Sequence, residues 1–239
     1  LCGFPKDAYH YYRVHWNDTP ALHLFPHWSW AGHEGQEIDV WCYANAVEVE
    51  LFLNGTSLGR KAMPRLRHVE WAVPFTPGTI EAVAYDDTGN EIARQHHTTA
   101  GPPARLVLKP WQDTVAADGR DVAILTVSVV DADGHPVPTS DCAVRFEVDG
   151  PALLLGTGNG NPISHESDKR DHRRLHAGLA QLLVQIGREP GTVEVHAHAD
   201  GLESATLRIE ARLAPIEPWI PSVDADATAK VETAIDNAL

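Results

Sequence analysis

A short stretch of the sequence combines aromatic and titratable side chains, which are the two kinds of group that a sugar site uses. His27, Trp28 and Trp30 lie almost side by side, and Glu34 follows them. A flat indole ring can pack against the C–H face of a sugar while a few placed polar groups bind its hydroxyls. The stretch therefore predicts a carbohydrate-binding loop. The alternative is structural, with the tryptophans wedged between a β-sandwich and a preceding domain.

A catalytic carboxylate pair is the next chemistry to consider. A glycosidase needs two carboxyl groups about 5–10 Å apart across the scissile bond. Glu34 and Glu37 lie beside the aromatic stretch and could converge. No second element supplies a partner in a recognisable motif, so solvated loop carboxylates are the simpler interpretation. We assign no catalytic residue to this chain.

Histidine pairs could bind a metal ion. His196 and His198 are two residues apart on a predicted strand, so both side chains would face one way, a geometry that zinc could use. His172 and His176 would share one face of a helix. Neither pair has a third ligand in the pattern, so we predict exposed or hydrogen-bonded histidines, no metal and no cofactor.

The glycine-rich run Gly156–Gly160 does not open a strand–helix–strand unit, which argues against a phosphate cradle. We expect these glycines to allow positive φ in a tight loop. The sequence has no GxSxG, P-loop or HExxH motif.

Composition limits the class of partner. The 239 residues are 43% apolar and 22% charged, with a net charge of −14. This is an ordinary globular composition, and the acidic surface argues against nucleic acid and anionic membrane as partners. No apolar run approaches the length of a membrane span. The three cysteines are far apart, have no metal-binding spacing and are expected to be small buried residues: Cys2, Cys42 and Cys142.

Short strands dominate the predicted secondary structure. Val49 and Leu51 alternate with Glu48 and Glu50, the period-two pattern of a half-buried strand, and Asn54-Gly55 predicts a type I′ hairpin turn. The strands of this first half are expected near 37–43, 47–53, 57–62, 68–75, 79–85 and 91–99. Those of the second half are expected near 105–108, 122–131, 144–148, 179–186, 193–199 and 205–211, with an irregular stretch at 156–174.

These patterns predict an all-β fold of two tandem immunoglobulin-like sandwiches. The first would span residues 22–100 and the second 104–212, separated by a proline-containing boundary at 100–103. Residues 213–239 are expected to be a proline-rich linker followed by a possible short helix.

Residues 1–21 are interpreted as the remnant of a preceding domain. A helix is predicted to open at 4–7, with Pro5 in its first turn. Tyr9, Tyr12 and Trp16 would line one of its faces, and they lack a partner surface nearby. We therefore expect this helix to be disordered, to repack on the sandwich or to mediate self-association. The chain begins at Leu1 without an initiator Met, so we expect a fragment of a longer protein.

Several motifs resemble glycoside hydrolase family 2, specifically its bacterial β-galactosidases. Residues 1–9 (LCGFPKDAY) and 22–30 (LHLFPHWSW) resemble the end of that family's catalytic barrel, and 41–59 (WCYANAVEVELFLNGTSLG) resembles the sandwich that follows it. Residues 158–166 and 178–185 resemble the family's last sandwich, which is related to bacterial Ig-like domains. Ser29 stands where the family often has Asn, and Asn161 where it often has Asp; either change could weaken a polar contact.

This resemblance implies that the family's two catalytic glutamates lie in the barrel, upstream of Leu1. The retaining hydrolysis of a β-galactoside would then belong to a parent protein whose barrel is the partner of this chain. The resemblance also favours a periplasmic or secreted location.

Three functions stay open at this point. The chain could be an accessory region that supports the barrel and lines its sugar site. It could instead be an independent carbohydrate-binding module, or a purely structural or adhesive tandem. Exposed tryptophans in a groove would favour the second, and buried tryptophans the third.

Overall fold

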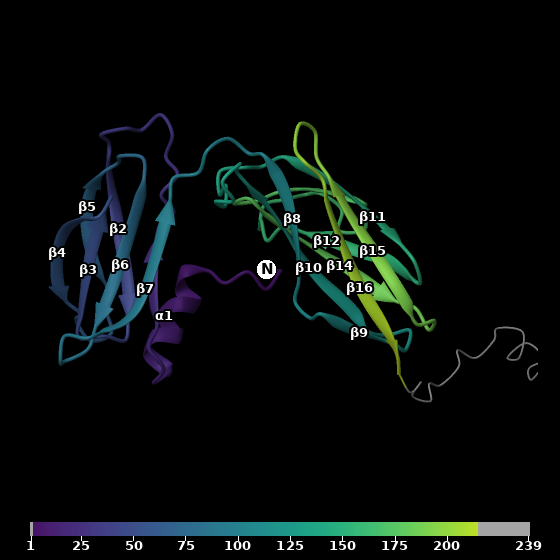
Figure 1. Cartoon of the computed structure of the whole chain (residues 1–239), viewed down its shortest axis with the longest axis horizontal. Helices are drawn as coiled ribbons and strands as arrows, with labels where there is room; N and C mark the ends of the chain where they lie inside the picture. The colour runs from purple at the N-terminus through teal and green to yellow at the C-terminus, as the bar shows by residue number, and fades with distance from the viewer. Residues whose placement is uncertain (1, 215–239) are drawn as a thin grey trace, which may run out of the picture.

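The computed structural model describes residues 2–214, which form one helix and sixteen strands. The strands build two β-sandwiches that lie side by side, with the helix α1 and the N-terminal end between them (Figure 1). The prediction of an all-β fold with tandem sandwiches is confirmed. No helix in this part of the chain is long and apolar enough to cross a membrane.

The first sandwich packs a three-stranded sheet, in the order β1-β2-β5, against a four-stranded sheet, in the order β4-β3-β6-β7. All of its strand pairs are antiparallel. The strands are β1 (Leu22–Phe25), β2 (Glu37–Ala44), β3 (Glu48–Leu53), β4 (Thr56–Ala62), β5 (Val69–Pro74), β6 (Thr79–Tyr85) and β7 (Glu91–Thr98).

The second sandwich packs the sheet β12-β14-β10-β8 against the sheet β13-β11-β15-β16-β9. Only the pair of β9 and β16 is parallel. The strands are β8 (Arg105–Pro110), β9 (Thr114–Ala117), β10 (Val122–Val130), β11 (Ala143–Asp149), β12 (Ala152–Gly158), β13 (His172–Arg174), β14 (Leu179–Ile186), β15 (Gly191–His198) and β16 (Ala205–Leu213).

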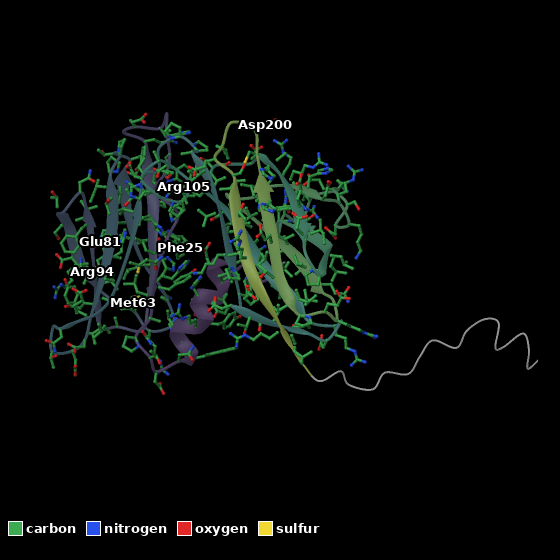
Figure 2. The ribbon with its side chains drawn as sticks, turned by 45° about the vertical axis from the view of Figure 1, so that its right-hand side comes forward. Phe25, Met63, Glu81, Arg94, Arg105 and Asp200 are labelled. Atoms are coloured by element: carbon green, nitrogen blue, oxygen red, sulfur yellow. The ribbon has the colours of Figure 1, made fainter. Side chains whose placement is uncertain are left out.

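The alternating pattern of β3 produces the expected faces. Val49 and Leu51 are fully buried in the first core, whereas Glu50 points outward and binds Arg60 of β4 at 3.2 Å. Asn54 and Gly55 have φ values of 50° and 79°, as the predicted hairpin turn requires. A second cross-strand pair, Arg94 of β7 with Glu81 of β6, is labelled in Figure 2.

The helix α1 (Asp7–Trp16) packs on the first sandwich. The face that makes this contact is opposite to the one that carries Tyr9, Tyr12 and Trp16. Val14 is buried, and the ring of Tyr11 contacts Tyr43 edge-on at 5.4 Å between centroids. Tyr9, Tyr12 and Trp16, by contrast, are 57%, 51% and 78% exposed. The helix is therefore ordered on the sandwich while its aromatic stripe faces outward.

Three details of the predicted elements were wrong. Pro5 precedes α1 rather than lying in its first turn, because Lys6 is the N-cap. Residues 22–25, where no strand was predicted, form β1. His172 belongs to β13, so His172 and His176 do not share a helix.

The glycines of the 156–160 run serve close packing more than positive φ. Gly156 and Gly158 are strand residues of β12, and only Gly160 of the three has a positive φ, 73°. A Cβ on Gly158 would lie 2.5 Å from Sγ of Cys2, and one on Gly156 would lie 2.8 Å from the Asp168 carbonyl. The N-terminal segment and the following loop thus require small residues here.

Two expectations remain: that the three cysteines are buried, and that the C-terminal stretch is a linker with a short helix. Only Cys42 is buried, and burial raises the pKa of its thiol to about 12; Cys2 and Cys142 are partly exposed. The predicted linker and short helix fall on residues 215–239, outside the described part of the chain.

Candidate functional site: a groove between the two sandwiches

Trp28 lies in the core of the first sandwich and presents no face to a ligand. Its side chain is 0% exposed, packs edge-on against Phe75 at 5.2 Å between centroids, and donates from Nε1 to the Thr76 carbonyl at 3.0 Å. A sugar cannot stack on a ring without exposed surface. The expectation that Trp28 could carry a sugar contact is therefore corrected, and this tryptophan is structural.

Trp30 and His27 form a stacked pair at the surface end of the same loop. Their ring centroids are 4.8 Å apart with planes inclined by 25°, and Trp30 Nε1 donates to the His27 carbonyl at 2.9 Å. The Ser29 amide donates to Nδ1 of His27 at 3.2 Å. Burial, together with the nearby His97, lowers the pKa of His27 and so favours the neutral ring. Because Nδ1 accepts the Ser29 hydrogen bond, the hydrogen of that neutral ring is on Nε2.

Glu34 does not join this pair. Its side chain is exposed, and Oε1 accepts a hydrogen bond from the Gly32 amide at 3.2 Å. The backbone amides of Glu34 itself and of Gly32 lower the pKa of this carboxyl group. Glu34 lies in a turn, and Glu37, which is also exposed, is the first residue of β2.

The pair of Trp30 and His27 lines a groove of about 600 Å³ between the two sandwiches. His33 also lines it from the first sandwich, Pro102 from the linker, and Thr139 from the second sandwich. Sequence reasoning missed Thr139 and Pro102, because nothing local indicates that they face a loop more than seventy residues upstream. We name this cavity the inter-sandwich groove.

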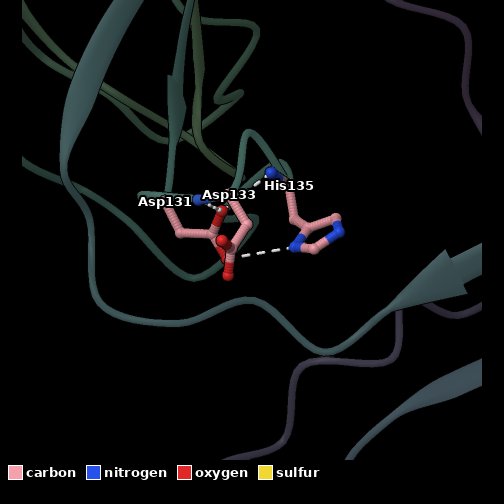
Figure 3. Close-up of side chains that lie close together, drawn as sticks. All are labelled: Asp131, Asp133 and His135. Atoms are coloured by element: carbon pink, nitrogen blue, oxygen red, sulfur yellow. Dashed lines mark hydrogen bonds and ion pairs between the residues drawn. The ribbon is translucent and has the colours of Figure 1, made fainter.

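A buried carboxylate fixes the linker that borders the inter-sandwich groove. Asp131 is 3% exposed, and its Oδ2 accepts the Gly101 amide at 2.8 Å. Its Oδ1 accepts the amides of Asp133 and His135 at 3.0 and 2.8 Å, and His135 Nδ1 also donates to Oδ2 at 3.3 Å. Figure 3 shows this turn. Burial opposes ionisation, but these donors outweigh it and lower the pKa of Asp131 to about 2.

Asp131, Asp133 and His135 are close enough together to be considered as metal ligands, and they are the only such group within residues 2–214. Both oxygens of Asp131 already accept hydrogen bonds from the protein, which explains the cluster without an ion. His196 and His198 bind Thr206 and Ser204 at 2.9 and 2.8 Å instead of converging on a third ligand.

The segment before α1 crosses to the second sandwich. Gln181 Nε2 of β14 donates to the Cys2 carbonyl at 2.9 Å. A Cβ on Gly3 would lie 2.6 Å from the Trp111 ring, so the backbone passes directly over that indole. Residues 2–16 therefore contact both sandwiches, and we name them the N-terminal strap.

Two family models match the chain. Residues 106–208 match the glycoside hydrolase family 2 C-terminal domain 5, and residues 35–93 match a domain of unknown function (DUF4982). Among curated proteins, the chain is 44% identical over 214 residues to Beta-galactosidase BoGH2A of Bacteroides ovatus, covering 88% of this chain and 25% of that protein. It is 35% identical to a putative beta-glucuronidase of Formosa agariphila, covering 80% of this chain and 19% of the relative.

Solved structures share the arrangement of both sandwiches. A beta-glycosidase from Bacteroides vulgatus superposes with a TM-score of 0.84 at 34% identity, over 88% of this chain and 27% of that one. A family 2 member from Bacteroides cellulosilyticus gives a TM-score of 0.81 at 30% identity, over 87% and 31%. The chain thus spans about a fifth to a quarter of the length of the curated relatives it matches.

Proposed function

Because the chain belongs to the C-terminal region of glycoside hydrolase family 2, we propose that it is an accessory region that supports the catalytic barrel of a longer, β-galactosidase-like enzyme. The observation that carries this proposal is the two-faced helix α1. One face is packed on the first sandwich through Val14 and Tyr11, and the other exposes three large aromatic side chains. We name Tyr9, Tyr12 and Trp16 the aromatic stripe.

Exposed apolar patches of this kind mark protein contact sites. The stripe lies near the start of a chain that covers 25% of a curated relative and matches a C-terminal domain of the family, so the partner we propose is the upstream barrel. Covering two tyrosines and a tryptophan would remove several hundred Å² of ring surface from water, enough to hold a domain contact.

The N-terminal strap extends this support to the second sandwich. The Gln181 bond to the Cys2 carbonyl and the passage of Gly3 over Trp111 hold the strap on β14 and beside β8, while α1 sits on β1 and β2. A barrel attached to the strap would therefore be positioned by both sandwiches. We also propose residues 22–100 and 104–212 as the two domains, with the upstream barrel supplying the catalytic carboxylates.

The name of the more similar of the two curated relatives described above supports a proposal for the substrate class. That protein is named a beta-galactosidase, whereas the relatives named beta-glucuronidase are 28–40% identical to this chain. We therefore propose a β-galactoside as the substrate of the parent enzyme, hydrolysed with retention of configuration.

We expect the isolated 239-residue chain to self-associate through the aromatic stripe, because the stripe lacks its proposed cover. Sedimentation velocity should show a concentration-dependent dimer or larger species. The triple variant Tyr9→Ser, Tyr12→Ser, Trp16→Ser should sediment as a monomer, since these exposed positions contribute no core packing.

The matched control replaces exposed apolar residues of the second sandwich, Leu153→Ser and Ile163→Ser, which are 55% and 79% exposed. This control should associate as the unmodified chain does. A strictly monomeric unmodified chain, with α1 helical by circular dichroism, would argue against the stripe as a docking surface.

A further inference from the structure

We propose that the inter-sandwich groove is a binding subsite for an uncharged glycan, with Trp30 as its platform. The groove has a volume of about 600 Å³, within the range of small-molecule sites. Its walls come from both sandwiches and from the linker, so the subsite belongs to this chain and does not depend on the barrel.

The indole of Trp30 lines the groove, and it is held in place by His27 and by the core of the first sandwich. His27 covers one face of the ring, and the Nε1–H group is already bonded to the His27 carbonyl. The indole therefore offers apolar ring surface rather than a hydrogen-bond donor to the groove. Pro102 adds further apolar surface to the lining. A preorganised flat apolar platform suits the C–H face of a pyranose.

Two histidines supply one donor and one acceptor beside that platform. Since Nδ1 of His27 accepts from Ser29, its Nε2 carries the hydrogen, and Nε2 has no partner within the described residues. Nδ1 of His33 donates to Gln36 Oε1 at 2.6 Å, so in the tautomer with its hydrogen on Nδ1 the other nitrogen, Nε2, is an acceptor. The exposed Thr139 hydroxyl, which lines the groove from the second sandwich, can donate or accept a hydrogen bond. Sugar hydroxyls both donate and accept, so this set fits a polyol.

The charge of the lining selects among glycans. Among residues 2–214, no Lys, Arg, Asp or Glu lines the groove, although the full chain carries 52 such residues. A uronate or sulfated sugar would bury its charge here without a counter-ion, in a protein of net charge −14. The groove therefore fits a neutral sugar, such as a galactoside, better than a uronic acid.

This inference rests on the chain's membership of a glycoside hydrolase family and on the groove itself. The aromatic stripe and the groove share no residue. A failure of α1 to bind the barrel would therefore not contradict glycan binding in the groove, and a groove that binds no glycan would not contradict the docking of α1.

The test titrates the isolated chain with methyl β-D-galactopyranoside and follows the indole N–H resonances of its seven tryptophans by heteronuclear NMR. The Trp30 resonance, assigned with Trp30→Phe, should shift saturably at millimolar sugar. The resonance of Trp111 should not shift, because Trp111 is an exposed indole at the opposite end of β8 from the linker. Methyl β-D-galacturonide, which differs only by a carboxylate at C6, should bind about tenfold more weakly or not at all.

Two variants separate binding from folding. Trp30→Ala should weaken galactoside binding about tenfold or more, because it removes the stacking contact. Isothermal titration calorimetry measures the change in affinity. Thr139→Trp should fill the groove from an exposed position of the second sandwich and abolish binding without lowering the melting temperature. Trp111→Ala should bind as the unmodified chain does.

The inference is overturned if the Trp30 resonance stays fixed at sugar concentrations that saturate ordinary lectin-type sites. It is equally overturned if the folded Thr139→Trp variant binds normally, or if Trp111 shifts in parallel with Trp30. A galacturonide that binds as well as the galactoside would contradict the assignment to neutral glycans.

Discussion

Replacing Trp28 by Ala should lower the free energy of unfolding of the chain by about 3–5 kcal/mol, the range for truncating a fully buried aromatic residue. Trp28 is 0% exposed, packs against Phe75 and donates to the Thr76 carbonyl. The substitution opens a cavity in the first sandwich and leaves that carbonyl without its donor. Urea unfolding followed by far-UV circular dichroism measures the change.

Two further tryptophan variants calibrate this result. Trp28→Phe keeps most of the packing and loses the hydrogen bond, so it should lower the free energy of unfolding by about 1–2 kcal/mol. Trp111→Ala removes an indole that is 54% exposed but lies under Gly3 of the N-terminal strap and donates to Thr126 Oγ1 at 3.3 Å, so it should lower the free energy of unfolding by about 1 kcal/mol. Equal effects of Trp28→Ala and Trp111→Ala would contradict the placement of Trp28 in the core.

Replacing Asp131 by Ala should destabilise the chain by about 1.5–3 kcal/mol, the range for hydrogen bonds to a charged group. The change removes the acceptor of the Gly101, Asp133 and His135 amides together. It should also loosen the linker at 100–103, which faster amide exchange at Gly101 would report. Asp133→Ala, at an exposed position two residues away, is the matched control and should have little effect.

Acid should reproduce the loss caused by Asp131→Ala. The pKa of this carboxyl group is lowered from 3.8 to about 2 in the folded chain. A lowered folded-state pKa contributes stability that is fully present above the unfolded value, and that stability is lost as the pH falls from about 4 to about 2. The difference in unfolding free energy between the unmodified chain and Asp131→Ala should therefore shrink over that window. A difference that is constant from pH 5 to pH 2 would show that Asp131 does not titrate as described.

The strands that could be predicted from the sequence are those with a clear two-residue period. Val49 and Leu51 of β3, and the run that forms β14, face a core on one side and were located within a residue or two. The strand β9 was missed because it is four residues long and pairs with β16 in parallel. The strand β12 was missed because Gly156 and Gly158 read as turn residues, whereas they allow the close approach of Asp168 and Cys2.

The candidate site shows the limit of reasoning from local sequence. A pair of tryptophans two residues apart predicts aromatic surface, but burial depends on which ring enters the core. Trp28 does so because Phe75 and Thr76, which directly follow β5, lie beside its ring, and the hydrogen bond to Thr76 spans 48 residues. The groove at Trp30 needs Thr139 and Pro102 as well, so it exists only once both sandwiches and their linker are in place.

The central claim is that this chain supports an upstream catalytic barrel through α1, and mixing the separated parts tests it most directly. The upstream remainder of the parent enzyme, produced without residues 1–239, should bind the isolated chain in isothermal titration calorimetry. Hydrolysis of nitrophenyl β-galactoside by the mixture should exceed that of the remainder alone. The aromatic-stripe triple variant should bind at least about tenfold more weakly, whereas the Leu153→Ser, Ile163→Ser control should bind normally. Equal binding of the triple variant and the unmodified chain would contradict the account.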